Sequence, residues 1–147
     1  MSSQLNVDTI VDKAGSGGTN VKIGNTSTYV SDGGAVTQNT VEGLAKVWVN
    51  FDGSASGATA RDSLNVSTMT DRGAGQFTIT FATVMGNTNY NSVASATVGG
   101  ADNYNRMAGA ASNATNFSYL NTFAQDGSSS ALADAAYTSA TFHGDLA

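Results

Sequence analysis

The sequence predicts an all-β protein: an antiparallel β-sandwich or jelly-roll-like domain with an extended N-terminal segment. Threonine and valine are common, whereas the strong helix formers glutamate, lysine, glutamine and leucine are scarce, which favours strands over helices. Several segments alternate apolar and polar residues, as in QFTITFA at 76–82. Glycine-rich turn signals separate these segments at short intervals, a pattern typical of sandwiches and barrels.

Residues 1–43 differ from the rest of the chain. Their apolar residues come in twos and threes between glycine-rich turns such as AGSGG at 14–18 and DGG at 32–34. Such short pieces bury too little surface to offset the chain entropy lost on folding. We therefore expect this segment to be ordered by partners, as an attachment and oligomerisation segment, although disorder is the alternative. Residues 44–147 are expected to form the β-sandwich domain.

The first predicted strand of the domain is AKVWVNF at 45–51. Val47, Val49 and Phe51 share one face and are expected to be buried. Trp48 lies on the opposite face, where it has three possible roles: covering a second sheet, packing against a neighbouring subunit, or stacking on a sugar. We favour the subunit interface.

A hairpin is expected next. SLNVSTMT at 63–70 alternates like a strand, DRGAG at 71–75 is a glycine-containing connection, and QFTITFA at 76–82 is the clearest strand in the chain. One apolar face and one polar face are the mark of antiparallel sheets. The residues of this hairpin expected in the core are Leu64, Val66, Phe77, Ile79 and Phe81.

The C-terminal third is expected to add further strands. One covers 90–98 after the GNTN turn, and residues 104–123 are ambiguous, with room for two short strands around a Ser-Asn turn. ALADAA at 131–136 is compatible with a helical turn, and YTSATFHGDL at 137–146 is expected to be the last strand.

Charge and hydropathy exclude two classes of partner. The net charge is −5, and the six basic residues are scattered, so the basic footprint of a nucleic-acid-binding protein is missing. No apolar run is long enough for a membrane span. The N-terminus has no secretory signal pattern, so we expect synthesis in a cytoplasm.

The sequence offers little catalytic chemistry. It has no cysteine and one histidine, His143, so a Cys–His pair or a multi-histidine metal site is excluded. A Ser-His-Asp triad would lack a G-x-S-x-G elbow, and the carboxylates are spread singly. Oxygen-rich loops at 102–105 and 126–130 do not fit the EF-hand spacing. We expect no enzyme, no cofactor and no obligatory metal.

The candidate for a receptor-binding site is the stretch from Gly99 to Ser130. This stretch combines asparagine and serine with aromatic rings, which suits hydrogen bonding to and stacking on a surface glycan. The alternative is that it packs against a neighbouring subunit. The candidate glycan-binding residues are Asp102, Tyr104, Arg106 and Tyr119.

Two stretches resemble a known family. The strand KVWVNFDG, the segment RDSLNVS and the hairpin TDRGAGQFT follow one another within residues 45–96. In that order they resemble a module near the C-termini of phage and prophage tail-fibre-like proteins. LNVDTIVDKAGSGG at 5–18 looks like the opening of many marine phage fibre and virion proteins. One departure is Gly86, because the family usually has proline after the methionine at position 85.

The resemblance implies a virion structural protein. The expected role is a short tail-fibre-like or spike-like component that attaches the particle to its host, works as a homotrimer, and meets other virion proteins through its N-terminal segment. The first alternative is a capsid decoration protein, a cement or head-fibre protein that stabilises the head lattice. A remote alternative is a polysaccharide-degrading spike. The expected location is the tail or capsid surface of the virion.

Overall fold

A computed structural model gives the fold. It describes residues 28–30, 37–39, 43–55, 57–98, 106–126 and 129–147. The chain divides into two compact units, Met1–Val41 and Glu42–Ala147. In the first unit, the described part is an antiparallel pair, β1 (Thr28–Val30) and β2 (Thr37–Asn39). The rest of the proposed attachment segment lies outside the described residues.

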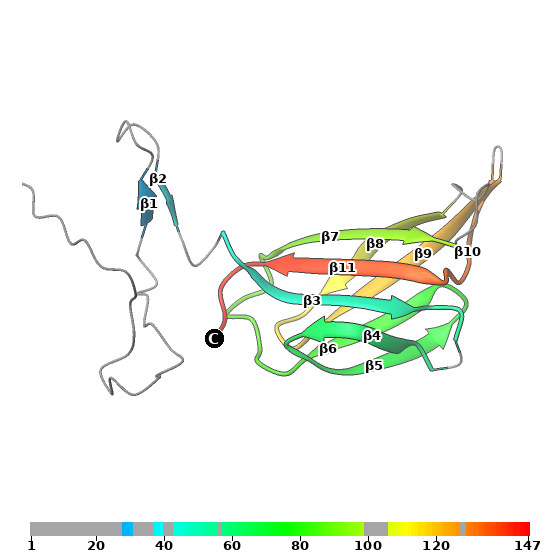
Figure 1. Cartoon of the computed structure of the whole chain (residues 1–147), viewed down its shortest axis with the longest axis horizontal. Coiled ribbons are helices and arrows are strands. Elements are labelled where there is room, and N and C mark those ends of the chain that lie inside the picture. Colours follow the sequence, from blue (N-terminus) through cyan, green and yellow to red (C-terminus); the bar gives the residue numbers. More distant parts are fainter. Residues whose placement is uncertain (1–27, 31–36, 40–42, 56, 99–105, 127–128) are drawn as a thin grey trace, which may run out of the picture. The chain divides into compact units, whose positions relative to one another are not determined.

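The second unit is built from two antiparallel sheets packed face to face (Figure 1). The four-stranded sheet has the order β4 (Thr59–Leu64), β3 (Ala45–Asp52), β11 (Tyr137–His143) and β7 (Asn91–Thr97). The five-stranded sheet has the order β10 (Ser129–Leu132), β9 (Phe117–Asp126), β6 (Gln76–Phe81) and β5 (Val66–Gly73), and β8 (Arg106–Asn113) also pairs with β9. This arrangement confirms the predicted antiparallel β-sandwich.

The sandwich core follows from the alternation in the strands. Along β3 and β6 every second side chain is buried, as expected for strands with one face on a core. Aromatic rings join the two sheets: Phe51 and Phe77 meet edge to face with centroids 5.0 Å apart, and Phe81 lies 5.3 Å from Phe142. The large buried side chains are Val47, Val49, Phe51, Phe77, Ile79, Phe81, Met85, Tyr90, Leu120 and Phe142.

The predicted hairpin at 71–75 is confirmed, but its connection is shorter than predicted, because β5 continues to Gly73 and only residues 74 and 75 lie between the strands. β5 and β6 pair antiparallel up to Gly73 and Gln76, and both Gly73 and Gly75 have positive φ angles of 128° and 64°. The Gly73 N–H donates to the Asp71 carboxylate at 2.9 Å, which closes the turn. Glycine is needed here because other residues rarely adopt these backbone angles.

The prediction that Leu64 is buried is wrong: its side chain is 47% exposed. The expected single strand at 63–70 is two strands, β4 in one sheet and β5 in the other, separated by Asn65 with a φ of 58°. This left-handed residue resets the alternation, so Leu64 and Val66 do not share a face. Val66 is half-buried against the core.

The helical turn expected at 131–136 is also wrong. β10 extends to Leu132, and residues 133–136 are an irregular connection. This connection is held by the sheet, since Ala133 N–H donates to Thr122 O at 3.1 Å and Gly53 N–H donates to Ala135 O at 3.0 Å. These tertiary backbone bonds outweigh the helix propensity of the alanines.

The remaining strand predictions agree with the structure. The ambiguous stretch at 104–123 contains β8 and the first part of β9, joined at residues 114–116, and the final strand is β11. β7 and β8 lie side by side, so the two sheets approach each other along this side (Figure 1). Among the described residues, no helix has the length and apolar character needed to cross a membrane.

Candidate functional site

The solvent face of the four-stranded sheet carries a row of apolar side chains. The register pairs Leu64 with Trp48, Trp48 with Thr141, and Thr141 with Val93. Trp48 and Thr141 stand on the face opposite the core, because their strand neighbours Val47, Val49, Ala140 and Phe142 are buried, and Leu64 and Val93 share that face as their ladder partners. Trp48 is half-buried, whereas Leu64 is 47% and Val93 is 60% exposed. We refer to Leu64, Trp48 and Val93 as the Trp48 row.

The next rows on this face are polar. Asn50 lies two residues from Trp48 along β3, and its side-chain amide donates to Ser139 Oγ at 2.9 Å. Asp62 pairs with Asn50, and Ser95 pairs with Ser139, which extends the polar row over all four strands. The Trp48 row is therefore bordered by hydrogen-bonding groups, as a protein interface is at its rim.

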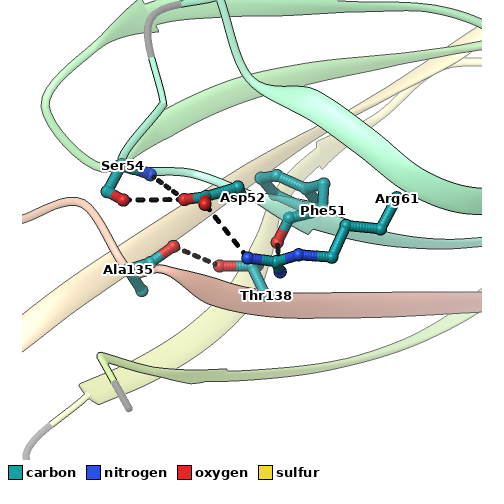
Figure 2. A network of polar contacts seen from close by, with 6 residues as sticks. All are labelled: Phe51, Asp52, Ser54, Arg61, Ala135 and Thr138. Atoms are coloured by element: carbon teal, nitrogen blue, oxygen red, sulfur yellow. Dashed lines mark hydrogen bonds and ion pairs between the residues drawn. The ribbon is translucent and has the colours of Figure 1, made fainter.

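An ion pair orders the other end of this face (Figure 2). Asp52 Oδ1 accepts hydrogen bonds from the backbone and hydroxyl of Ser54 at 3.0 and 2.7 Å, and Asp52 Oδ2 lies 3.0 Å from Arg61 Nη2. Arg61 also donates to Phe51 O at 3.0 Å and lies 4.7 Å from the ring centroid of Tyr137. The Ser54 hydroxyl, with the charge of Arg61, holds the pKa of Asp52 below its usual value.

The solvent face of the other sheet carries aromatic rings along β9. Phe117 and Tyr119 lie with ring centroids 4.9 Å apart, and the Arg72 guanidinium lies 4.2 Å from the centre of the Tyr119 ring. Further along, Phe123 pairs with Met107 on one side and Leu132 on the other. Tyr119, a predicted glycan-binding residue, is therefore part of an outward-facing aromatic strip.

The structure separates the two described members of the predicted glycan site. Arg106 pairs with Ala124, which lies on the same face of β9 as the buried Leu120 and Thr122, whereas Tyr119 points to the opposite face. Arg106 Nε donates to Asp134 O at 3.3 Å. The other two members, Asp102 and Tyr104, lie outside the described residues.

Sequence reasoning missed Arg72 and Val93. Arg72 comes from the bulged end of β5, and its contact with Tyr119 depends on the pairing of β6 with both β5 and β9. Val93 stands among polar residues in β7, and only the long-range register with β11 places it beside Trp48. In the sequence, Val93 is marked only as an apolar residue whose neighbours on the same face of the strand, Asn91 and Ser95, are polar.

Metal binding needs clustered ligands, and proton transfer needs a group with a suitable pKa. In the part of the chain that the structure describes, no three His, Cys, Asp or Glu residues are placed to hold a metal ion. Burial raises the pKa of the Tyr90 hydroxyl, which donates to Ala114 O at 3.0 Å and lies 3.2 Å from Phe117 O. Tyr90 thus ties the core to the β8–β9 connection, which is a structural role.

Comparison of the chain with protein-family models, curated proteins and solved structures finds no match. The candidate sites must therefore be interpreted from their own geometry.

Proposed function

We propose that this chain is a non-enzymatic structural protein of a bacteriophage particle, a short tail-fibre-like or spike-like component that attaches the particle to its host. It works as a homotrimer, meets other virion proteins through its N-terminal segment, and contacts a host surface glycan. The phage assignment rests on the resemblance of residues 5–18 and 45–96 to phage fibre and virion proteins. The assembly rests on the Trp48 row.

The Trp48 row is the observation that carries the assembly of copies in this proposal. A sheet of a sandwich already buries one face, and its solvent face is normally polar. Here three large apolar side chains lie in one row across the sheet, with Thr141 between Trp48 and Val93, and Leu64 and Val93 are exposed. An apolar patch with a polar border is what a subunit interface needs. We assign this face to contact between copies of the chain.

The residues of the resembling module support a scaffold role. The Asn65 side chain accepts from Thr83 N–H at 2.6 Å and donates to Thr83 O at 3.0 Å, which fixes the passage between the two sheets. Arg61 is occupied by Asp52 and Phe51 O. These residues build the sandwich, and a scaffold shared by many particles leaves host specificity to other surfaces.

The aromatic strip on β9 supports a glycan contact, because its rings Phe117 and Tyr119 lie outside the resembling module. Phe117 and Tyr119 offer half-buried rings, and Arg72 fixes the Tyr119 ring from one side. Rings on a rigid sheet suit stacking on the apolar face of a sugar, because little side-chain entropy is lost on binding.

Imaging of whole particles tests the proposal. Antibodies raised against the purified chain, labelled with gold, should decorate the tail of the phage that carries this chain, and soluble chain should compete with the phage for cells. Labelling spread over the capsid lattice would instead select a head decoration protein. Cleavage of host polysaccharide by the purified chain would overturn its non-enzymatic character.

A further inference from the structure

A polar hollow of about 410 Å³ opens on the surface at the end of the sandwich. Its walls come from the β6–β7 connection, the first residue of β7 and the chain that leaves β11. Its size lies within the range of small-ligand pockets, about 300–1,000 Å³. The lining residues are Asn87, Asn89, Asn91, His143, Gly144 and Asp145.

Backbone hydrogen bonds fix the two walls against each other. Gly86 N–H donates to Asp145 O at 2.8 Å, and Ala147 N–H donates to Val84 O at 3.0 Å. His143 pairs directly with Asn91, so the β-ladder joins the walls at the inner end. The hollow is therefore formed before any ligand arrives, which lowers the entropy lost on binding.

The floor of the hollow is closely packed. A Cβ atom on Gly144 would lie 2.6 Å from Tyr90 Cβ, so only glycine fits against the buried tyrosine without movement. Tyr90 is itself held by the hydrogen bond from its hydroxyl to Ala114 O. The backbone at position 144 therefore packs directly against Tyr90 and cannot shift toward it.

Most polar side chains of the walls have no partner within the protein and are available to a ligand, with Asn87 as the exception among the described lining residues. Asn87 is occupied, because its Oδ1 accepts from Asn89 N–H at 2.7 Å and shapes the turn. Within the described part of the chain, the side chains of Asn89, Asn91, His143 and Asp145 make no hydrogen bond or ion pair with the protein. Two amides, an imidazole and a carboxylate thus face one small space.

The kind of ligand follows from these groups. No lysine or arginine lines the hollow, so a phosphate or sulfate would lack a counter-charge. One carboxylate is too few for a tight calcium site, which takes six to eight oxygen ligands. No large apolar side chain lines it either. Amides donate and accept together, and an imidazole does the same, which matches hydroxyl groups that also do both.

We propose that this hollow binds one neutral sugar residue of a glycan, with Asn89, Asn91 and His143 hydrogen-bonding its hydroxyl groups. The inference deepens the proposed host attachment and rests on it for the source of the glycan. It places a saccharide contact at the end of the sandwich, apart from the aromatic strip on β9.

The chain carries its own reporter for this site. His143 is the only histidine in the sequence, so its imidazole signals in an NMR spectrum are assigned without ambiguity. The full chain is titrated at constant pH with D-glucose, D-galactose, D-mannose and N-acetyl-D-glucosamine, each up to about 100 mM, where a site with millimolar Kd is filled. At least one sugar is expected to shift the His143 signals saturably.

Paired variants locate the binding. N89A/N91A removes two amides from the walls but keeps Asn87 and its turn, and is expected to weaken binding of the active sugar by about tenfold or more. T88A is the matched control, an exposed residue of the same β6–β7 connection that does not line the hollow, and should bind as the unmodified chain does. The proposal would be overturned if none of the four sugars shifted the His143 signals. It would also be overturned if the active sugar shifted them equally in N89A/N91A and in the unmodified chain.

The two proposals fail separately. Capsid labelling on whole particles together with a saturable His143 shift would reject host attachment and keep the sugar site. Tail labelling and competition for cells with a silent His143 would keep host attachment and reject the hollow as its sugar site.

Discussion

At the scale of single residues, Gly75 joins three parts of the chain. Its N–H donates to Asp134 Oδ1 at 2.6 Å, and its carbonyl accepts from Thr122 N–H at 2.7 Å. It also has a positive φ of 64°, and an added Cβ would collide with the backbone of Thr122 and Ala133. The hairpin, β9 and the irregular connection after β10 therefore all depend on the missing side chain.

We expect Gly75→Ala to lower the free energy of unfolding by more than about 3 kcal/mol, because backbone atoms must move as well as the φ angle. Gly73→Ala is the matched control. Its φ is 128°, but nothing lies within 4 Å of the added Cβ, so it should cost only the strain, about 1–3 kcal/mol. Urea unfolding measures both, and equal losses would contradict the role assigned to the close approach.

Asp52 makes the stability of the fold depend on pH in a defined direction. Its pKa in the folded chain lies below the ordinary value of 3.8, mainly because the Ser54 hydroxyl donates to the carboxylate. A carboxyl with a lowered folded pKa stabilises the fold above its unfolded pKa. That contribution is lost as the pH falls through the folded pKa.

We therefore expect the difference in unfolding free energy between the unmodified chain and Asp52→Asn to be constant above about pH 5 and to shrink below pH 3.8. Ser54→Ala, which removes the hydroxyl that donates to the carboxylate, should reduce this acid dependence. Urea titrations from neutral pH to about pH 2 measure it. A difference that grows on acidification would show that the sign is wrong.

At the scale of elements, Asn65 is the point where the chain leaves one sheet for the other. β4 ends one residue before it and β5 begins one residue after it. Its left-handed backbone turns the chain, and its side-chain amide hydrogen-bonds both the N–H and the carbonyl of Thr83. Asparagine suits this position because it tolerates the left-handed region better than most residues and can bond locally.

We expect Asn65→Ala to lower the free energy of unfolding by about 2–3 kcal/mol, from two lost hydrogen bonds and the positive φ. Asn65→Gly loses the same bonds but adopts the φ freely, so it should cost about 1 kcal/mol less than alanine. Thermal or urea unfolding of the pair separates the two causes. A glycine variant less stable than the alanine variant would contradict the assigned backbone role.

The alternation of side chains predicts most strands, because burial on one face is a local pattern. It identifies β3, β6 and the strands at the end of the chain, and it places Trp48 on the outer face. It fails at 63–70, since one left-handed residue within an otherwise regular pattern leaves no trace in hydropathy. It also fails at 131–136, where hydrogen bonds to distant residues decide the conformation.

The candidate site is less predictable than the fold, because it depends on which strands become neighbours. Trp48 and Leu64 are close in sequence, but Val93 joins them only through the pairing of β7 with β11 and of β11 with β3. Arg106 and Tyr119 show the converse. They look like one polar–aromatic group in the sequence, and the register of β8 with β9 puts them on opposite faces.

At the scale of the whole molecule, the two sheets differ in what their outer faces offer. One carries the Trp48 row with a polar border, and the other carries the aromatic strip on β9 with Met107, which is 57% exposed. If copies of the chain meet through the Trp48 row, the strip remains available for a glycan. On the proposed function, this division would let one small sandwich assemble and bind at the same time.

The double variant Leu64→Thr/Val93→Thr tests whether the Trp48 row is the interface between subunits. Both side chains are exposed and in strands, so threonine should keep the fold while removing apolar surface from the interface. We expect the full chain to be a trimer by light scattering and the double variant to be a folded monomer with unchanged circular dichroism. Met107→Thr, an equally exposed change on the other sheet, should leave the trimer intact. A trimer that survives the double change but dissociates in Met107→Thr would move the subunit interface to the other sheet.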